Sequence, residues 1–452
     1  MLGFVATSLA AGAQEQTQTQ SQPQEQAAQQ EQKLVLTLEQ ALEIALSESP
    51  TIKIADQQIE AKRYAKQGTY AALYPQIDAT ASYQRVIQKQ TMSMDFGGQT
   101  QTIKVGSDNS FNGGVTLGMP VVNAQLWQSL KVSALDVELA VEQARSSRID
   151  MIEQVTKAYY GVLLAKQSYE LFQRVYDNTV ANNEFIKGRY KVGSVSEYDL
   201  ITSNVSVQNA LPNMIEAEYS VVLALWQLKA LLGIDLEREI DVTGSLMDYV
   251  SVLDQSYNIS QIDLENNTTI KQLGMQEQML EHALKITKLA NVPSLSLSAA
   301  YLYTALGNDG KFFKKEAWNP YSYAGVQLNI PIFAGNKRRA ATREARINLS
   351  NLQLQRENVE RQLRVGIVQY LNNMQSSVKK YHASAATLDQ AQRGYDIAVK
   401  RYDVGRGTLV DVDNSQVALV QAELSRNQSI FNFLSAKVSL DKVLGNYNFD
   451  NE

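Results

Sequence analysis

The longest helical pattern in the chain runs from Asn336 to Tyr402, and it constrains the fold more than any other feature. This stretch contains no proline, and good helix formers such as Ala, Leu, Gln, Arg and Glu dominate it. Its apolar residues recur three and four positions apart, which predicts a helix with one buried stripe. At ~1.5 Å per residue such a helix is ~100 Å long. A compact globular domain needs no rod of that length, so the fold is expected to be elongated.

The same pattern occurs earlier in the chain, so the sequence is a tandem duplication. The stretch Ala124–Tyr190 is also free of proline. Each long run ends in a similar turn, Arg189–Gly193 or Arg401–Gly405, and the two turns are 212 positions apart (401 − 189). A second helical run follows each turn, over Ser196–Leu232 and Thr408–Leu444. An internal repeat is interpreted before any other pattern, because it determines the architecture of the whole fold. Here it predicts two antiparallel pairs, each made of a long helix and a return helix.

Four segments change to a period of two, which predicts strands. They cover about 75–86 and 109–121 in the first repeat, joined by a polar loop, and about 293–304 and 321–332 in the second. Each has a polar and an apolar face, which fits either a soluble sheet on a core or a membrane barrel. The small, nearly uncharged polar faces and the aromatic residues near the strand ends favour the barrel. Four strands cannot close a barrel, since about eight is the smallest filled one, so other copies must supply the rest.

The remaining segments complete the domain organisation. The first repeat is expected over 34–233, and the second, with its long helix over about 336–402, over 268–445. A linker at 234–267 separates them, with a short strand near Glu239–Val242 and a short helix near Leu246–Leu253. In the first return helix Pro212 is expected to bend or break the helix.

The two ends of the chain are expected to lie outside the fold. Residues 1–13 end in Ala-Gly-Ala and look like the remnant of a secretory signal peptide, although a frayed terminus is the alternative. Residues 14–33 are rich in Gln and are expected to be disordered. Residues 446–452 form a short tail.

Composition excludes several classes of protein. The chain has no cysteine, which rules out disulfides, thiolate metal sites and a cysteine nucleophile. A net charge of −5 gives no reason to expect a nucleic-acid partner. No H-E-x-x-H, P-loop or dinucleotide fingerprint occurs. We therefore expect neither an enzyme nor a cofactor, and interpret His282 and His382 as surface or packing residues.

Three features together resemble the TolC family of outer-membrane efflux proteins. They are the opening Leu36–Leu42 (LTLEQAL), the two R-Y-x-V-G turns and the duplication itself, and they span about 36–445. The resemblance implies an α+β, mainly α fold, in which three chains form a 12-stranded β-barrel joined to a long periplasmic α-helical barrel. It implies an outer-membrane exit duct of a tripartite efflux or type I secretion system.

The same resemblance implies the partners of such a duct. They are two further copies in a homotrimer, a periplasmic adaptor (membrane fusion) protein, an inner-membrane transporter of the RND or ABC type, and outer-membrane lipid. The alternative function is a periplasmic coiled-coil scaffold or adhesin with a small β-domain.

Site residues follow from the resemblance position by position. The turn residues Val192, Gly193, Val404 and Gly405 match the tip where the adaptor docks. Asp199 and Tyr402 match positions that bond to each other and hold the tip closed. Asp411 matches an acidic ring in the pore.

The sequence departs from the family at the gate. The second ring acid falls on Asn414, with Asp413 beside it, and the basic gate residue falls on Gly407, with Arg406 beside it. Because two residues on a helix are ~200° apart, Asp411 and Asp413 cannot both face the pore. We therefore expect a single acidic ring and a looser lock.

Two local patterns can also be interpreted without the resemblance to the family. Ser196-x-x-Asp199 and Thr408-x-x-Asp411 both predict capping boxes at the start of the return helices. A basic cluster opens the second long helix, and it fits lipid headgroups, the duct lining or a merely solvated face. Its members are Lys337, Arg338, Arg339, Arg343 and Arg346.

Overall fold

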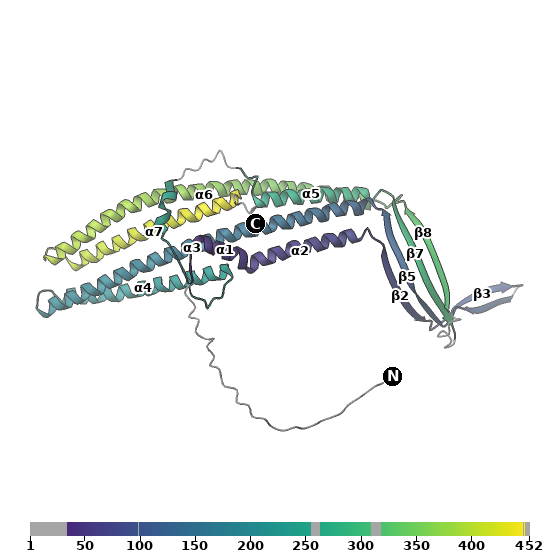
Figure 1. The fold of residues 1–452 in the computed structure, drawn as a ribbon, viewed down its shortest axis with the longest axis horizontal. Coiled ribbons are helices and arrows are strands. Elements are labelled where there is room, and N and C mark those ends of the chain that lie inside the picture. Colours follow the sequence, from purple (N-terminus) through teal and green to yellow (C-terminus); the bar gives the residue numbers. More distant parts are fainter. Residues whose placement is uncertain (1–33, 98, 255–262, 309–317, 446, 448–452) are drawn as a thin grey trace, which may run out of the picture.

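The computed structural model describes residues 34–97, 99–254, 263–308, 318–445 and 447, which form an elongated molecule with a sheet at one end (Figure 1). Two long helices, α3 (Ala124–Lys191) and α6 (Lys337–Asp403), dominate it. Each folds back on a return helix, α4 (Glu197–Leu232) or α7 (Leu409–Leu444). The predicted rods and the predicted antiparallel pairs are therefore confirmed. None of the helices in the described ranges is long and apolar enough to cross a membrane.

The four strands of the main sheet come from both repeats. They are β2 (Gln76–Arg85), β5 (Asn109–Val122), β7 (Ser294–Gly307) and β8 (Trp318–Asn329). Their order is β2-β5-β7-β8, and every pair is antiparallel. Strand β5 therefore joins the two repeats into one sheet, because it pairs with β7 over most of its length. Strands β2 and β8 are left as the two edges.

The segment between β2 and β5 differs from the prediction. Instead of a polar loop it holds a second, two-stranded sheet, β3 (Gln90–Phe96) and β4 (Gln99–Val105). The hairpin leaves the far end of the main sheet as a separate arm (Figure 1). Met92, Met94 and Ile103 alternate with polar residues that include Thr91 and Thr102, and β-branched Thr favours extended backbone.

Shorter elements surround the middle of the helices. Helices α1 (Leu38–Glu48) and α2 (Pro50–Ala71) precede β2, and α5 (Thr268–Leu289) precedes β7. Thr37 and Gln40 form the capping box of α1. In the linker, the predicted strand is β6 (Ile240–Val242), which pairs in parallel with β1 (Leu34–Leu36). The predicted short helix is the 3₁₀ helix η1 (Leu246–Asp254).

The main apolar core lies at this level and joins α1, α3, α4, α7 and the linker. Tyr159 of α3 is 1% exposed and ties the linker to the core, since its hydroxyl donates to the carbonyl oxygens of Leu36 (3.2 Å) and Thr243 (2.6 Å).

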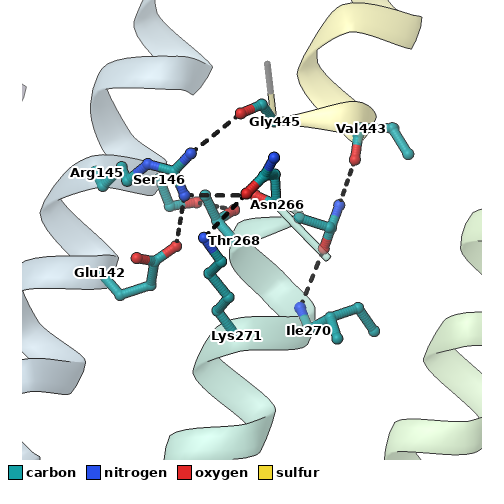
Figure 2. Close-up of polar contacts among 10 residues, drawn as sticks. Glu142, Arg145, Ser146, Asn266, Thr268, Ile270, Lys271, Val443 and Gly445 are labelled. Carbon is teal, nitrogen blue, oxygen red and sulfur yellow. Dashed lines mark hydrogen bonds and ion pairs between the residues drawn. The ribbon is translucent and has the colours of Figure 1, made fainter. Parts of the chain in front are cut away.

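Helix α7 ends where α5 begins, and an arginine of α3 holds this junction together (Figure 2). The Arg145 guanidinium donates to the carbonyl oxygens of Gly445 (3.0 Å) and Asn266 (3.4 Å). It also forms an ion pair of 3.0 Å with Glu142, which is only 8% exposed. Gly445 has a φ of 67°, the left-handed conformation that commonly ends a helix. The end of α7 is therefore fixed on α3.

Asn267 makes the second half of the junction. Its amide nitrogen donates to the Val443 carbonyl (2.7 Å), and its side-chain oxygen accepts from the backbone N–H of Ile270 (3.0 Å). One side chain thus caps the last turn of α7 and the first turn of α5. As a result α5 continues the line of α7 toward the sheet, as Figure 1 shows.

Pro212 does not break the return helix of the first repeat. Helix α4 runs without interruption from Glu197 to Leu232 with Pro212 inside it. A proline within a helix costs about 3 kcal/mol through its missing N–H and its ring clash. Packing of α4 along α3 on both sides of the proline offsets that cost, so the predicted break is wrong.

Candidate functional site

The two turns at the end away from the sheet form the helical tip. Gly193 and Gly405 both have a φ of 72°, the left-handed conformation that favours glycine. The following residues close each turn, because the N–H of Ser194 donates to the Arg189 carbonyl and that of Arg406 to the Arg401 carbonyl, both at 2.8 Å. An atom added as Cβ at either glycine would meet nothing within 4 Å. The glycines are thus required by backbone conformation and not by space.

Apolar side chains lie at the very end of the tip. Val192 is 79% exposed and Val404 is 69% exposed. Each directly precedes its glycine, so both point into solvent at the reversal of the chain. The two turns therefore present an exposed apolar side chain at equivalent positions of the two repeats.

Both return helices begin with the predicted capping boxes. The Asp199 N–H donates to the Ser196 hydroxyl (3.1 Å), and the Ser196 N–H donates to the Asp199 carboxylate (3.2 Å). Thr408 and Asp411 make the same two bonds at 3.2 and 3.0 Å. Hydrogen bonds from the backbone and side chain of Thr408 lower the pKa of Asp411. Asp411 therefore keeps its charge well into the acidic range, at a solvent-exposed position.

Tyr402 lies inside the tip. It is 8% exposed and packs with Ile186, Leu409 and Val412. Its hydroxyl is buried and has no hydrogen-bond partner among the described residues. Burial raises the pKa of Tyr402, and the charge of nearby Asp199 raises it further. The two residues are thus brought close together, but the bond between them that the resemblance implies is not formed in this structure.

A contact that the sequence did not reveal joins the two helical pairs above the tip. The hydroxyl of Ser206 on α4 donates to the carboxylate of Asp413 on α7 at 2.8 Å. Burial raises the pKa of Asp413. Asp413 therefore faces α4, and with Ser206 it lines a cleft of about 390 Å³, while Asp411 caps its own helix. The expectation that these two carboxylates point in different directions agrees with this arrangement.

The local geometry also explains why position 407, on which the basic gate residue was expected to fall, is a glycine with Arg406 beside it. Arg406 is exposed and lies in the turn itself. At Gly407 an added Cβ would lie 3.2 Å from both Arg401 Cβ and the Tyr402 nitrogen, which is a tight contact. A long basic side chain at position 407 would crowd the last turn of α6.

With this geometry described, comparison with known proteins identifies the family. Residues 41–234 and 259–446 match the profile of the family described as outer membrane efflux protein, which is most of the chain. The chain belongs to the outer membrane efflux protein family. The two matched segments correspond to the two repeats.

Individual relatives agree with this assignment. The chain is 21% identical to the outer membrane protein TolC of Vibrio cholerae over 403 residues, covering 89% of each chain. It is 22% identical to the alkaline protease secretion protein AprF of Pseudomonas aeruginosa, covering 89% of this chain and 82% of that protein. Among solved structures, the Campylobacter jejuni CmeC outer membrane channel superposes with a TM-score of 0.71 at 18% identity, covering 92% of this chain and 87% of that one.

As a member of the outer membrane efflux protein family, the chain has the TolC-like, mainly α fold and forms an exit duct in the outer membrane, with its helices extending into the periplasm. Family membership favours this function over a scaffold or adhesin. The family consists of channel proteins.

The remaining candidate residues have local roles. His282 on α5 hydrogen-bonds through Nδ1 with the Gln128 side chain on α3, and burial, followed by the nearby charge of Lys285, lowers its pKa. A neutral packing residue fits both observations. In the described ranges, no group of three or more His, Asp or Glu side chains is placed to hold a metal ion.

Within the basic cluster, Arg338 differs from its neighbours. It donates to the carbonyl of Pro331 and to the side chain of Asn291, both at 3.0 Å, and so ties the start of α6 to the end of α5. The other members are exposed on the first turns of α6, namely Lys337, Arg339, Arg343 and Arg346.

Proposed function

We propose that three copies of this chain assemble around one axis into a closed duct, and that the tip of this duct docks an adaptor and carries the gate. The main sheet has four strands and two unpaired edges, β2 and β8. Backbone groups on an open edge cannot be satisfied in lipid, so a sheet in the outer membrane must close through other copies. The proposed barrel therefore takes four strands from each of three chains.

One stripe on α4 carries this proposal. Along this stripe the positions alternate between three and four residues apart. Apolar residues occupy all of them except two, which are Gln208 and Pro212. The apolar residues are between 38 and 69% exposed in the single chain: Tyr198, Ile201, Val205, Ile215, Tyr219, Val222 and Trp226. Such spacing is that of a coiled-coil seam, which packs against another helix.

The duplication indicates which helix covers the stripe. At the 212-residue offset, Tyr219, Val222 and Trp226 fall on Phe431, Leu434 and Val438 of α7. Leu434 and Val438 are 2% and 7% exposed, and Phe431 is half-buried against the same core. Contacts such as that between Ser439 and Glu153 of α3 (3.0 Å) hold α7 there. By pseudo-symmetry α4 packs against α6, the other long helix, and that α6 belongs to the next copy.

A crosslinking experiment tests this seam. The offset maps Ser439 onto Gln227 and Glu153 onto Val365, which is 68% exposed. Because the natural chain has no cysteine, Gln227→Cys combined with Val365→Cys should be linked by a short bismaleimide into covalent trimers in native membranes. Each single variant alone is the control and should give no ladder. Monomers only from the double variant would refute the trimer.

The partners in this proposal bind at the two ends of the helical part. A periplasmic adaptor covers the exposed valines Val192 and Val404 on the turns at Gly193 and Gly405, and an inner-membrane transporter of the RND or ABC type supplies the energy. Outer-membrane lipid surrounds the sheet. The relatives include an alkaline protease secretion protein and a pyoverdine export outer membrane protein, which supports a place in such a tripartite system.

The gate in this proposal is a single acidic ring. Three Asp411 carboxylates, charged into the acidic range, surround the axis at the tip and favour cations. The Tyr402 hydroxyl, which is buried near Asp199 and has no hydrogen-bond partner in the part of the chain that the structure describes, is available for the bond that locks the tip. Arg406 lies on the adjoining turn. Asp411→Asn should therefore reduce cation selectivity in planar bilayers. Asp413→Asn is the matched control, because Asp413 faces α4, and equal selectivity in the two variants would refute the ring.

A further inference from the structure

The β3–β4 hairpin has one apolar face that the described residues leave exposed. Its register pairs Met92 with Ile103, Met94 with Gln101 and Gln90 with Val105. Directly paired residues in an antiparallel pair point to the same side, so four apolar side chains share one face. They are between 40 and 46% exposed: Met92, Met94, Ile103 and Val105. The opposite face carries Thr91, Ser93, Asp95, Thr102 and Lys104.

This hairpin needs a partner to be stable. Among the described residues, β3 and β4 pair only with each other. An isolated two-stranded hairpin is marginally stable at best in water, and three or more strands with a shared apolar face are needed for stability. The uncovered apolar face is therefore the surface on which a partner is expected.

The base of the hairpin is fastened to the rim of the main sheet. Lys89 forms an ion pair with Asp108 (3.1 Å) and donates to the side chain of Asn308 (3.1 Å). The same Asn308 oxygen accepts from the Asp108 N–H at 2.9 Å. Asn308 directly follows β7, so these bonds join the base of the hairpin to the end of a strand from the other repeat. The direction in which the arm leaves the rim is thus fixed by the fold.

We propose that the apolar faces of three hairpins, one from each copy, meet on the threefold axis and cover the outer mouth of the duct. This inference rests on the proposed trimer. The hairpin lies at the end of the sheet away from the periplasmic helices, which is the extracellular side (Figure 1).

The dimensions of the parts allow this contact. A strand of seven residues is ~24 Å long at ~3.4 Å per residue. Twelve strands spaced ~4.8 Å apart and tilted ~40° give a perimeter of ~75 Å, and therefore a barrel radius of ~12 Å. The hairpin is about twice as long as the distance from rim to axis, so it can reach the axis even when it leaves the rim obliquely.

Polar groups on the hairpin argue against lipid as the occupant. Lys104 and Asp95 lie on its other face, and the Lys89–Asp108 ion pair lies at its base. Both outer edges also carry unpaired backbone groups, which hydrocarbon cannot satisfy. A second and a third copy of the same hairpin can cover the apolar face while water reaches the edges.

Single cysteines on the two faces test the proposal. Met94→Cys should form a disulfide between subunits on mild oxidation in native membranes, and Ser93→Cys, the adjacent residue on the opposite face, should not. The oxidised Met94→Cys channel should lose at least half of its conductance in planar bilayers and regain it on reduction. Deletion of residues 90–105 should raise conductance above that of the wild type.

Three results would overturn the proposal. One is a Met94→Cys protein that fails to crosslink in membranes where the Gln227/Val365 pair does, which would leave the trimer intact and remove only the cover. Another is unchanged conductance after deletion of the hairpin. The third is quenching of a bimane label at Met92→Cys by brominated lipid, which would show that the apolar face is buried in the membrane.

Discussion

Replacing Gly445 with alanine should destabilise the protein far more than replacing Gly405, although both glycines have nearly the same backbone conformation. Their φ angles are 67° and 72°. The left-handed conformation alone costs a non-glycine residue about 1–2 kcal/mol. At Gly405 an added Cβ meets nothing within 4 Å. Gly405→Ala should therefore cost only that conformational energy.

At Gly445 the methyl group has no room. The added Cβ would lie 2.2 Å from the Asn266 carbonyl oxygen and 2.8 Å from its carbon, and both are backbone atoms. Overpacking of this kind costs about 1–3 kcal/mol. Moving the two backbones apart also strains the bonds from Arg145 to both carbonyls, each worth about 1.5–3 kcal/mol for a charged donor. Gly445→Ala should thus lose about 3–6 kcal/mol, against about 1–2 kcal/mol for Gly405→Ala.

Thermal unfolding of the detergent-purified protein, followed by the helical circular dichroism signal at one scan rate, measures this difference. The expected order of midpoints is wild type, then Gly405→Ala, then Gly445→Ala well below. Gly193→Ala, at another open turn with a φ of 72°, should match Gly405→Ala and serves as the second control. Equal shifts for Gly445→Ala and Gly405→Ala would refute the role assigned to the α7–α5 junction.

Three further predictions concern stability and are measured by the same unfolding assay. Arg145→Met leaves the buried Glu142 without its cation and should cost about 3–5 kcal/mol; Glu142→Gln in the same chain should recover part of it, and no recovery would contradict the pairing. Burial raises the pKa of Asp413 in the folded state above its value in the unfolded state. The free energy of unfolding therefore falls as the pH rises from the unfolded-state pKa to the folded-state pKa. Asp413→Asn should therefore be more stable than the wild type at neutral pH and equal to it at acidic pH, and a less stable variant at neutral pH would contradict this. Tyr402→Phe removes a buried hydroxyl that has no partner among the described residues, so it should not lower the midpoint while the proposed lock is open; a marked drop would mean that the purified protein holds the tip in the locked state.

The sequence predicted those parts of the fold that are encoded locally. Helix propensity and apolar spacing within one stretch located α3 and α6, and the turns followed from Gly193 and Gly405, whose conformation only glycine adopts easily. The S-x-x-D and T-x-x-D patterns located both capping boxes. Each of these signals lies within a few residues of the element that it predicts.

The parts that could not be predicted depend on contacts between distant residues. Arg145 meets Gly445 across 300 positions, and Ser206 meets Asp413 across 207. Neither pair has a local pattern that would indicate it. Helix α4 continues through Pro212 without the predicted break for a related reason, since helix packing along α3 outweighs a local cost.

The duplication also explains why this chain cannot be complete by itself. In the trimer proposed above, each repeat would place its return helix against the long helix of the other repeat, and the structure of one chain contains only one of these two contacts. The second repeat makes that contact, because Leu434 and Val438 of α7 are buried in the shared core. The first repeat leaves Val222 and Trp226 of α4 exposed at the corresponding places. The sheet repeats this imbalance, since β5 and β7 pair across the repeats while β2 and β8 remain edges. The proposed ring of identical copies would therefore cover the exposed face of α4 and pair the two edge strands at the same time.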